Sequence, residues 1–115
     1  MRHPSVFGPP QDWPAQDLIA FSEEFDPGLT LAAYRCGAFP MPLHGSGFRE
    51  MGWWSPMRRG ILPVDGLRVT RSLSQAAKRY TTTVDQAFEA VLAGCADPTR
   101  ESGWIDHEIE GVYTD

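Results

Sequence analysis

One stretch of the chain combines a capped helix with two closely spaced prolines, and it restricts the fold more than any other segment. Asp26 is a favourable N-cap, Pro27 suits the first turn of a helix, and Gly37 can end a helix in the left-handed conformation. This pattern predicts a short helix over residues 27–36. Because a proline steers the residue before it away from helical backbone, Phe39-Pro40-Met41-Pro42 predicts an extended segment directly after the helix.

The first 17 residues predict an extended leader without regular structure. Four prolines and a glycine fall in this stretch, and proline lacks the N–H that helices and sheets use. Trp13 is expected to pin the leader to the body of the protein, since tryptophan buries a large apolar area.

The second half of the chain predicts strands and helices in alternation. Residues 59–64 and 80–84 are expected as strands, the first closing in a turn at Asp65-Gly66 and the second rich in β-branched residues. Three helices are expected after N-caps. In the first, Thr70 is the cap and Leu73, Ala76 and Ala77 are core positions. In the second, Asp85 is the cap and Ala87, Phe88, Val91 and Leu92 are core positions. In the third, Asp106 is the cap and Ile109, Val112 and Tyr113 are core positions.

Length and composition indicate one folded domain, or one domain and part of another, of mixed α+β class. The chain has 115 residues, of which 42% are hydrophobic and 22% charged, an ordinary globular balance. Helical signals continue to Asp115 without a glycine, proline or charge run to end the last helix. We therefore expect the chain to be cut within a domain.

Several classes of protein are disfavoured. No apolar run approaches the ~18 to 20 residues that cross a bilayer, and the N-terminus lacks a signal peptide, so we expect a cytoplasmic protein without a membrane partner. Cys36 and Cys95 lack the spacing of a disulfide scaffold or a zinc site, and no metal is expected. His3, His44 and His107 are expected to be exposed or capping. Motifs for nucleotide binding and hydrolysis are also absent from the sequence.

Charge is distributed unevenly along the chain. The formal net charge is -5, yet the segment from Arg49 to Arg79, here called the basic segment, holds seven cations against two anions. A polyanion responds to the local field, because exposed charges act over about 8 Å at physiological salt. The basic segment indicates a surface that binds a polyanion, with cations scattered on a solvated face as the alternative.

Tryptophans add flat surfaces to these cations. Trp53, Trp54 and Trp104 can each stack on an unpaired base, a contact worth ~1 to 3 kcal/mol, while cations hold the phosphates. This combination is typical of single-stranded RNA binding. The alternative, which we favour for Trp53 and Trp54 taken alone, is that paired tryptophans belong to the core.

Five motifs follow one another in a fixed order from Leu31 to the C-terminus. They are LAAYRCGAFP (residues 31–40), WWSP (53–56) followed by Arg58 and Arg59, VTRSL (69–73), AFEAV (87–91) with Cys95-Ala96, and GWI (103–105) with Tyr113. In order and spacing, this set resembles the bacterial leucyl/phenylalanyl-tRNA-protein transferase family. The shared order carries the resemblance, since no single motif is specific.

The resemblance implies an enzyme that transfers leucine or phenylalanine from Leu-tRNA or Phe-tRNA to a protein with N-terminal Arg or Lys, marking that protein for degradation. It implies no metal or organic cofactor, and a monomer when complete. The implied fold is a small N-terminal α/β domain followed by an acetyltransferase-like (GNAT-like) domain. We therefore expect the leader over 1–17, the small domain over 18–62, and the incomplete start of the acetyltransferase-like domain over 63–115.

The resemblance also implies a site for the 3′-terminal adenosine of the tRNA. Trp104 matches a tryptophan that packs on this adenosine, and Tyr113 matches a tyrosine near the same end. Met41 stands where the family usually has the tryptophan that forms the other wall. Its polarizable thioether can cover a base, though over a smaller area than an indole.

A second group of residues is implied to contact the acceptor stem. Lys78 and Arg79 match basic residues with this role, and Arg71 lies beside them as a further phosphate contact. Trp53 and Trp54 belong to the family signature and are assigned to packing around the pocket.

The catalytic groups are not expected within this chain. The carboxylates and amide that the family uses around the reacting amine are expected beyond Asp115. Two other classes of function stay open at this point: a non-catalytic tRNA- or RNA-binding module, and a plain interaction domain whose tryptophans are all core residues. The sequence does not distinguish leucine from phenylalanine, nor does it identify the protein acceptors.

Overall fold

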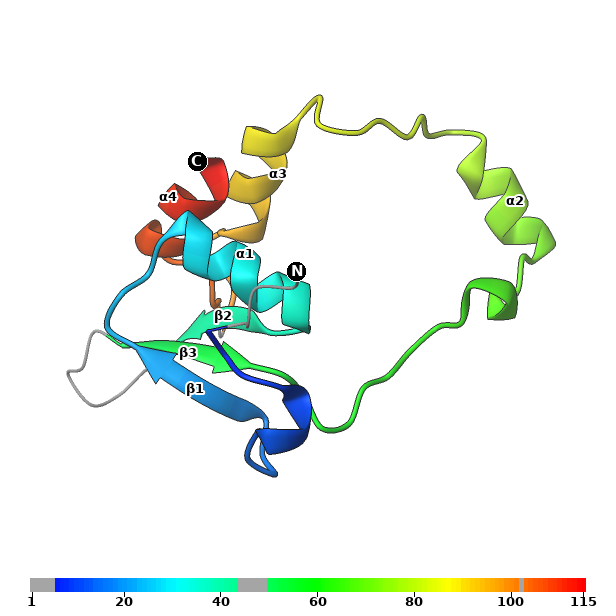
Figure 1. Ribbon diagram of the computed structural model, residues 1–115. Helices are drawn as coiled ribbons and strands as arrows, with labels where there is room; N and C mark the ends of the chain where they lie inside the picture. Colours follow the sequence, from blue (N-terminus) through cyan, green and yellow to red (C-terminus); the bar gives the residue numbers. More distant parts are fainter. Residues whose placement is uncertain (1–5, 44–49, 102) are drawn as a thin grey trace.

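The computed structural model describes residues 6–43, 50–101 and 103–115 (Figure 1). The strands are β1 (Leu18–Ser22), β2 (Phe39–Pro42) and β3 (Met51–Trp54), and the helices are α1 (Pro27–Cys36), α2 (Arg71–Ala77), α3 (Phe88–Cys95) and α4 (His107–Thr114). Two 3₁₀ turns are η1 (Pro10–Asp12) and η2 (Val64–Gly66). The mixed α+β class is confirmed. The expectations for His3, His44 and Arg49 lie outside the described residues.

A small antiparallel sheet with the order β1-β3-β2 supports the core. Trp53 on the central strand lies opposite Ala20 on one side and Pro40 on the other. The core consists of the buried residues Ala33, Ala38, Met51, Trp53 and Ile109. Since these residues come from β3, from α1 and the turn after it, and from α4, the C-terminal helix packs into the same core as the sheet (Figure 1).

Helix α1 forms as the sequence predicts. The Leu29 N–H donates to Oδ1 of Asp26 at 2.8 Å, which satisfies one of the unpaired amides of the first turn. Gly37 has φ 89°, the left-handed conformation that ends the helix at low steric cost. The predicted extended segment is also confirmed, since it forms strand β2.

The leader and β1 depart from the expectation. Residues 10–12 form η1 where no regular structure was expected, and β1 gave no clear signal of its own. The Trp13 indole donates to the carbonyl of Phe7 at 2.8 Å, a contact within the leader. The Phe7 ring in turn packs edge-on against Trp53 at 5.2 Å. Phe7 therefore makes the contact with the body that was assigned to Trp13.

Both strands predicted in the second half are wrong. Residues 59–63 and 80–84 are exposed and unpaired in the structure, and the predicted turn after the first of them is the 3₁₀ turn η2. A strand needs a neighbour to satisfy its backbone groups, and no described strand lies beside either segment. The helix cap predicted at Asp85 is also wrong: α3 begins at Phe88, after Ala87, and Asp85 has φ 56°.

Helices α2 and α4 begin at their predicted caps. Thr70 accepts from the Leu73 N–H at 3.2 Å, and Asp106 accepts from the Ile109 N–H at 2.9 Å. Ile109 is fully buried, whereas Leu73 is 43% exposed because α2 lies away from the sheet and the other helices (Figure 1). No helix within the described ranges is both long enough and apolar enough to span a lipid bilayer.

Candidate functional site

An aromatic cluster of Tyr34, Trp104 and Tyr113 lies where α1 meets α4. Tyr113 follows the fully buried Ile109 by four residues, so both side chains share one face of α4. Burial of Ile109 therefore positions Tyr113 at the edge of the core. The ring centroid of Tyr113 lies 6.4 Å from that of Trp104 and 6.3 Å from that of Tyr34.

The cluster combines fixed rings with accessible surface. Trp104 and Tyr113 are half-buried and pack on the core, and their rings meet edge-to-face at 73°. This geometry is a favourable arrangement of two aromatic quadrupoles. Tyr34 is 52% exposed, and its hydroxyl forms a hydrogen bond with that of Tyr113. The cluster can therefore present preformed aromatic surface to a planar ligand.

The protonation of Tyr113 follows from its surroundings. Burial raises the pKa of Tyr113 first, and the hydrogen bond and charge interaction with Tyr34 raise it further. A tyrosine is neutral at physiological pH even with its ordinary pKa, and the raised pKa extends the range in which Tyr113 keeps its proton to higher pH. Nothing in the sequence pairs Tyr34 with this site, because its partner Tyr113 lies 79 residues away in the chain.

Met41 lies on β2 and is half-buried. Trp104 and Tyr113 are among the described residues that pack against the core, and Met41 is not. Its backbone carbonyl accepts a hydrogen bond from the Trp54 indole at 3.1 Å. The structure thus brings Trp104 and Tyr113 together, whereas Met41 is bonded to Trp54.

The adjacent tryptophans differ in environment. Trp53 is only 1% exposed, contacts Phe7 and Phe25, and donates its indole N–H to Oγ of Ser22 at 2.8 Å. Trp54 is half-buried. The interpretation of Trp53 as a core residue is confirmed, and its polar edge is satisfied as a buried donor requires.

The basic residues of α2 stand apart from the aromatic cluster. Arg71 begins α2, Lys78 is its C-cap and Arg79 follows, and all three are exposed. The helix lies on the far side of the molecule from α1 and α4 (Figure 1). The structure therefore places these three residues on one short helix and at its C-terminal end, apart from Trp104.

One cation of the basic segment has a structural role. The Arg59 guanidinium donates to the carbonyl of Gly37 at 3.1 Å and to Oγ of Ser55 at 2.8 Å. A cation at the C-terminus of a helix is favourable, because the last carbonyls carry partial negative charge. Asp17 holds the same loop by accepting from the Met57 N–H at 2.8 Å. Arg59 is thus engaged within the protein.

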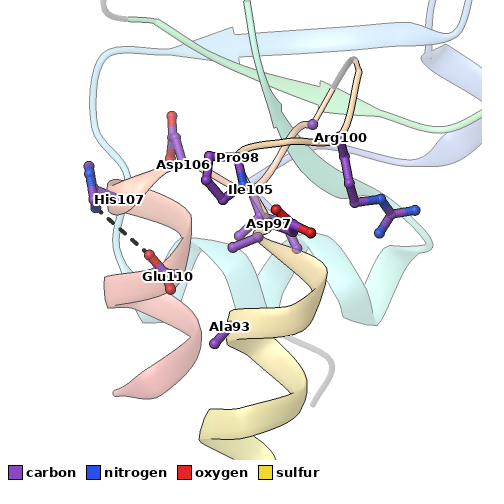
Figure 2. A pocket seen from close by; sticks show the side chains of 10 residues that line it. Ala93, Asp97, Pro98, Arg100, Ile105, Asp106, His107 and Glu110 are labelled. Carbon is purple, nitrogen blue, oxygen red and sulfur yellow. Dashed lines mark ion pairs between the residues drawn. The ribbon is translucent and has the colours of Figure 1, made fainter.

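A cavity of about 580 Å³ lies between α3 and α4 (Figure 2). Its lining includes Asp97, Arg100, Asp106, His107 and Glu110. Two of its carboxylates already accept hydrogen bonds. Asp106 caps α4 by accepting from the Ile109 N–H. Asp97 accepts from the amide and the hydroxyl of Thr99, and these hydrogen bonds lower the pKa of Asp97. The exposed His107 lies 3.8 Å from Glu110. Within the described ranges, no three His, Cys, Asp or Glu side chains are grouped to hold a metal ion.

Comparison with known proteins relates both halves of the chain to one family. Residues 23–57 match the family model described as leucyl/phenylalanyl-tRNA protein transferase N-terminal domain, and residues 61–115 match leucyl/phenylalanyl-tRNA protein transferase. The two matches follow one another along the chain and include α1, strands β2 and β3, and the aromatic cluster.

Curated relatives agree with these matches. The leucyl/phenylalanyl-tRNA–protein transferase of Nitrobacter winogradskyi is 38% identical over 96 residues, covering 80% of this chain and 42% of the relative. The protein of the same name from Rhizorhabdus wittichii is 42% identical over 94 residues, covering 78% of this chain and 38% of the relative. That from Ruegeria sp. is 45% identical over 87 residues, covering 74% and 40%.

These findings define the class of protein as the tRNA–protein transferases. Within that class, the chain belongs to the leucyl/phenylalanyl-tRNA protein transferase family. The chain spans about two fifths of the length of the curated relatives that it matches.

Proposed function

We propose that this chain is part of an enzyme that transfers leucine or phenylalanine from aminoacyl-tRNA to the N-terminal Arg or Lys of acceptor proteins, which marks them for degradation. The observation that carries the proposal is the tandem order of the two family matches, over residues 23–57 and 61–115. The relatives bear the same name and are more than twice as long as the region matched.

The proposed reaction is the aminolysis of an activated ester. The α-amine of the acceptor attacks the carbonyl carbon that joins the amino acid to the tRNA, the ester C–O bond breaks, and the amine loses a proton. Such a reaction is accelerated by holding the amine against the carbonyl and by stabilising the oxyanion. We assign tRNA binding to this chain and the groups around the amine to the region beyond Asp115. The reaction needs no metal or organic cofactor.

For the 3′-terminal adenosine, we propose a site at Trp104 and Tyr113, with Met41 as the opposite wall. Support comes from the half-burial of the two rings, which fixes them and leaves area for contact. Stacking on one base is worth about 1 to 3 kcal/mol. Packing around this region is assigned to Trp53, which lies in the core on which Trp104 and Tyr113 pack, and to Trp54, whose indole donates to the carbonyl of Met41.

For the acceptor stem, we propose contacts from Lys78, Arg79 and Arg71. Arg71 lies on α2 and Lys78 and Arg79 directly after it; all three are exposed, and no ion pair with another described residue occupies their charges. Each phosphate that a cation neutralises releases condensed counterions, so binding must weaken as salt rises. The separation of α2 from the aromatic cluster fits an extended ligand that reaches both (Figure 1).

The domain organisation is part of the proposal. We propose a leader over 1–17, a small domain over 18–62 and the start of a GNAT-like domain over 63–115. The packing of Ile109 on Ala33 and Trp53 supports a close junction between the last two parts. A cytoplasmic monomer fits a protein that works on aminoacyl-tRNA.

Binding of Leu-tRNA to this chain tests the tRNA contacts. The double variant Lys78→Gln/Arg79→Gln should weaken binding and reduce the slope of log K against log salt by about 1 to 2, one unit for each lost phosphate contact. The matched control is Arg35→Gln/Arg100→Gln, which removes two exposed cations outside the basic segment. An unchanged affinity and slope for the Lys78/Arg79 variant at moderate salt would refute the stem contacts.

Transfer of labelled leucine tests the activity. The chain, continued by the region that its longer relatives contain, should transfer leucine from Leu-tRNA to a peptide beginning with Arg and not to its N-acetylated form. A chain that binds Leu-tRNA but never transfers leucine in this setting would instead be a non-catalytic RNA-binding module.

A further inference from the structure

Three segments of the chain meet in a set of hydrogen bonds beyond the end of β3, here called the polar clasp. It consists of Asp17, Gly37, Ser55, Met57 and Arg59. The Ser55 N–H donates to the carbonyl of Asp17 at 2.8 Å, and the Met57 N–H donates to Oδ1 of the same residue at 2.8 Å. Asp17 directly precedes β1, which pairs with β3. Asp17 therefore fixes the chain just after it leaves the sheet.

Arg59 completes the polar clasp. Its guanidinium donates to the carbonyl of Gly37, the C-cap of α1, at 3.1 Å and to Oγ of Ser55 at 2.8 Å. These bonds join the end of the leader, the end of α1 and the loop after β3. Because the three segments are distant in the sequence, the polar clasp exists only once the sheet and α1 have packed.

Beyond Arg59, the chain runs to α2 without comparable contacts. Residues 60–69 are exposed, contain only η2 as regular structure and pair with no described strand. They lead to α2, and so to Lys78 and Arg79 at its end (Figure 1). The other end of α2 continues into a second exposed segment, residues 80–87, that leads to α3. On the side of the sheet, the polar clasp is thus the fixed point from which α2 is held.

We propose that Asp17 is a positioning residue for the contacts of Lys78 and Arg79 with the acceptor stem: its two hydrogen bonds fix the point from which the chain runs to α2. This inference rests on the proposed function, which assigns these two cations to the stem. A ligand that touches both the body of the protein and α2 gains affinity from the short connection between them, because the second contact forms at a high effective concentration. A longer and looser connection lowers that concentration.

The size of the effect follows from the length of this connection. Residues 60–70 connect the polar clasp to α2, which makes 11 residues, and release of residues 57–59 would extend the connection to 14. Effective concentration falls as roughly the 3/2 power of length, so the longer connection alone weakens binding about 1.4-fold. Pro63 stiffens the connection, so the direction in which it starts also matters. We expect a total loss of about two- to fivefold.

Two RNAs test the role of Asp17: an acceptor-stem minihelix that ends in CCA, and a single strand of the same four 3′ nucleotides. Asp17→Ala should bind the minihelix about two- to fivefold more weakly and with a smaller dependence on salt, and it should bind the single strand as the wild type does. Removal of a negative charge by itself favours binding to a polyanion. Weaker binding of the minihelix therefore reports the lost hydrogen bond and not the lost charge.

Two control variants separate the hydrogen bond from the charge. Asp17→Asn removes the charge and keeps Oδ1 as an acceptor for the Met57 N–H, so it should bind the minihelix at least as tightly as the wild type. Asp12→Ala removes a carboxylate from the exposed turn η1, outside the polar clasp, and should do the same. If Asp17→Asn binds the minihelix as weakly as Asp17→Ala does, the inference is overturned.

The outcomes also separate this inference from the proposed function. If Lys78→Gln/Arg79→Gln binds the minihelix as the wild type does, the stem contacts fail and the role of Asp17 fails with them. If that double variant binds weakly and Asp17→Ala does not, only the role of Asp17 is overturned. Equal weakening of both RNAs by Asp17→Ala assigns the residue to general stability and also overturns the inference.

Coupling between the variants gives a further readout. Because Asp17 acts through Lys78 and Arg79, adding Asp17→Ala to Lys78→Gln/Arg79→Gln should cost no further affinity for the minihelix, and additive losses would overturn the inference. If Asp17→Ala folds poorly, Ser55→Ala, which removes an acceptor of Arg59 from the polar clasp, must show the same loss confined to the minihelix.

Discussion

Gly52 lies at the centre of the sheet, where a side chain has no room. A Cβ at this position would lie 2.7 Å from Nε1 of Trp54, 3.0 Å from the carbonyl oxygen of Met41 and 3.1 Å from Cδ1 of Leu18. The Trp54 indole donates to that same carbonyl at 3.1 Å. In Gly52→Ala the new methyl group therefore lies too close to both the donor and its acceptor, and the indole must move.

The magnitude follows from three effects. Overpacking costs about 1 to 3 kcal/mol and the lost hydrogen bond about 1 kcal/mol, whereas replacing glycine by alanine recovers about 0.4 to 1 kcal/mol by restricting the unfolded chain. We expect Gly52→Ala to lower the free energy of unfolding by about 2 kcal/mol and the melting temperature by about 8 °C. Thermal and urea unfolding followed by circular dichroism measure both.

Two further variants make this prediction refutable. Gly94→Ala is the matched control, because a Cβ at Gly94 in α3 meets nothing within 4 Å, and it should stabilise the protein by about 0.5 kcal/mol. Trp54→Phe removes Nε1, so Gly52→Ala should cost less in that background than in the wild type. A Gly52→Ala protein as stable as the wild type, or an equal cost in both backgrounds, would refute the reasoning.

Two other predictions concern polar groups. Ser22→Ala leaves the buried indole N–H of Trp53 without its acceptor, so urea unfolding should show a loss of about 1 to 3 kcal/mol, against less than about 0.5 kcal/mol for the exposed Ser74→Ala. Because the folded state raises the pKa of Tyr113, the free energy of unfolding should be unaffected by this group below pH 10.0 and should fall as the pH rises above it, where the unfolded chain ionises first. Tyr113→Phe should lessen this alkaline loss, and an unchanged pH profile would contradict the prediction.

Local sequence signals predicted the elements that depend on neighbouring residues. Asp26 and Gly37 bound α1 as expected, and Thr70 and Asp106 cap their helices. Each cap bonds an amide three residues away, so its partner is present in the same short segment. The family assignment was likewise available from the order of motifs along the chain.

Signals without a local partner were less reliable. The β-branched run at 80–84 predicted a strand that is not present, while β1 forms because β3 pairs with it. Strand preference describes a residue that fits a pleated, half-buried surface, and such a surface exists only where another strand supplies it. In the segments 61–69 and 80–84 several apolar residues are exposed, so an apolar composition alone does not create such a surface.

The candidate site shows the same division. The sequence by itself determined which residue types carry the proposed function, namely Trp104 and Tyr113 for a base and Lys78 and Arg79 for phosphates. Only the tertiary structure decided that Tyr34 bonds Tyr113 across 79 residues and that α2 stands apart from both. The physical reason is that a cap or a turn is closed by atoms a few residues away, whereas a contact between α1 and α4 exists only once the core around Ile109 has packed.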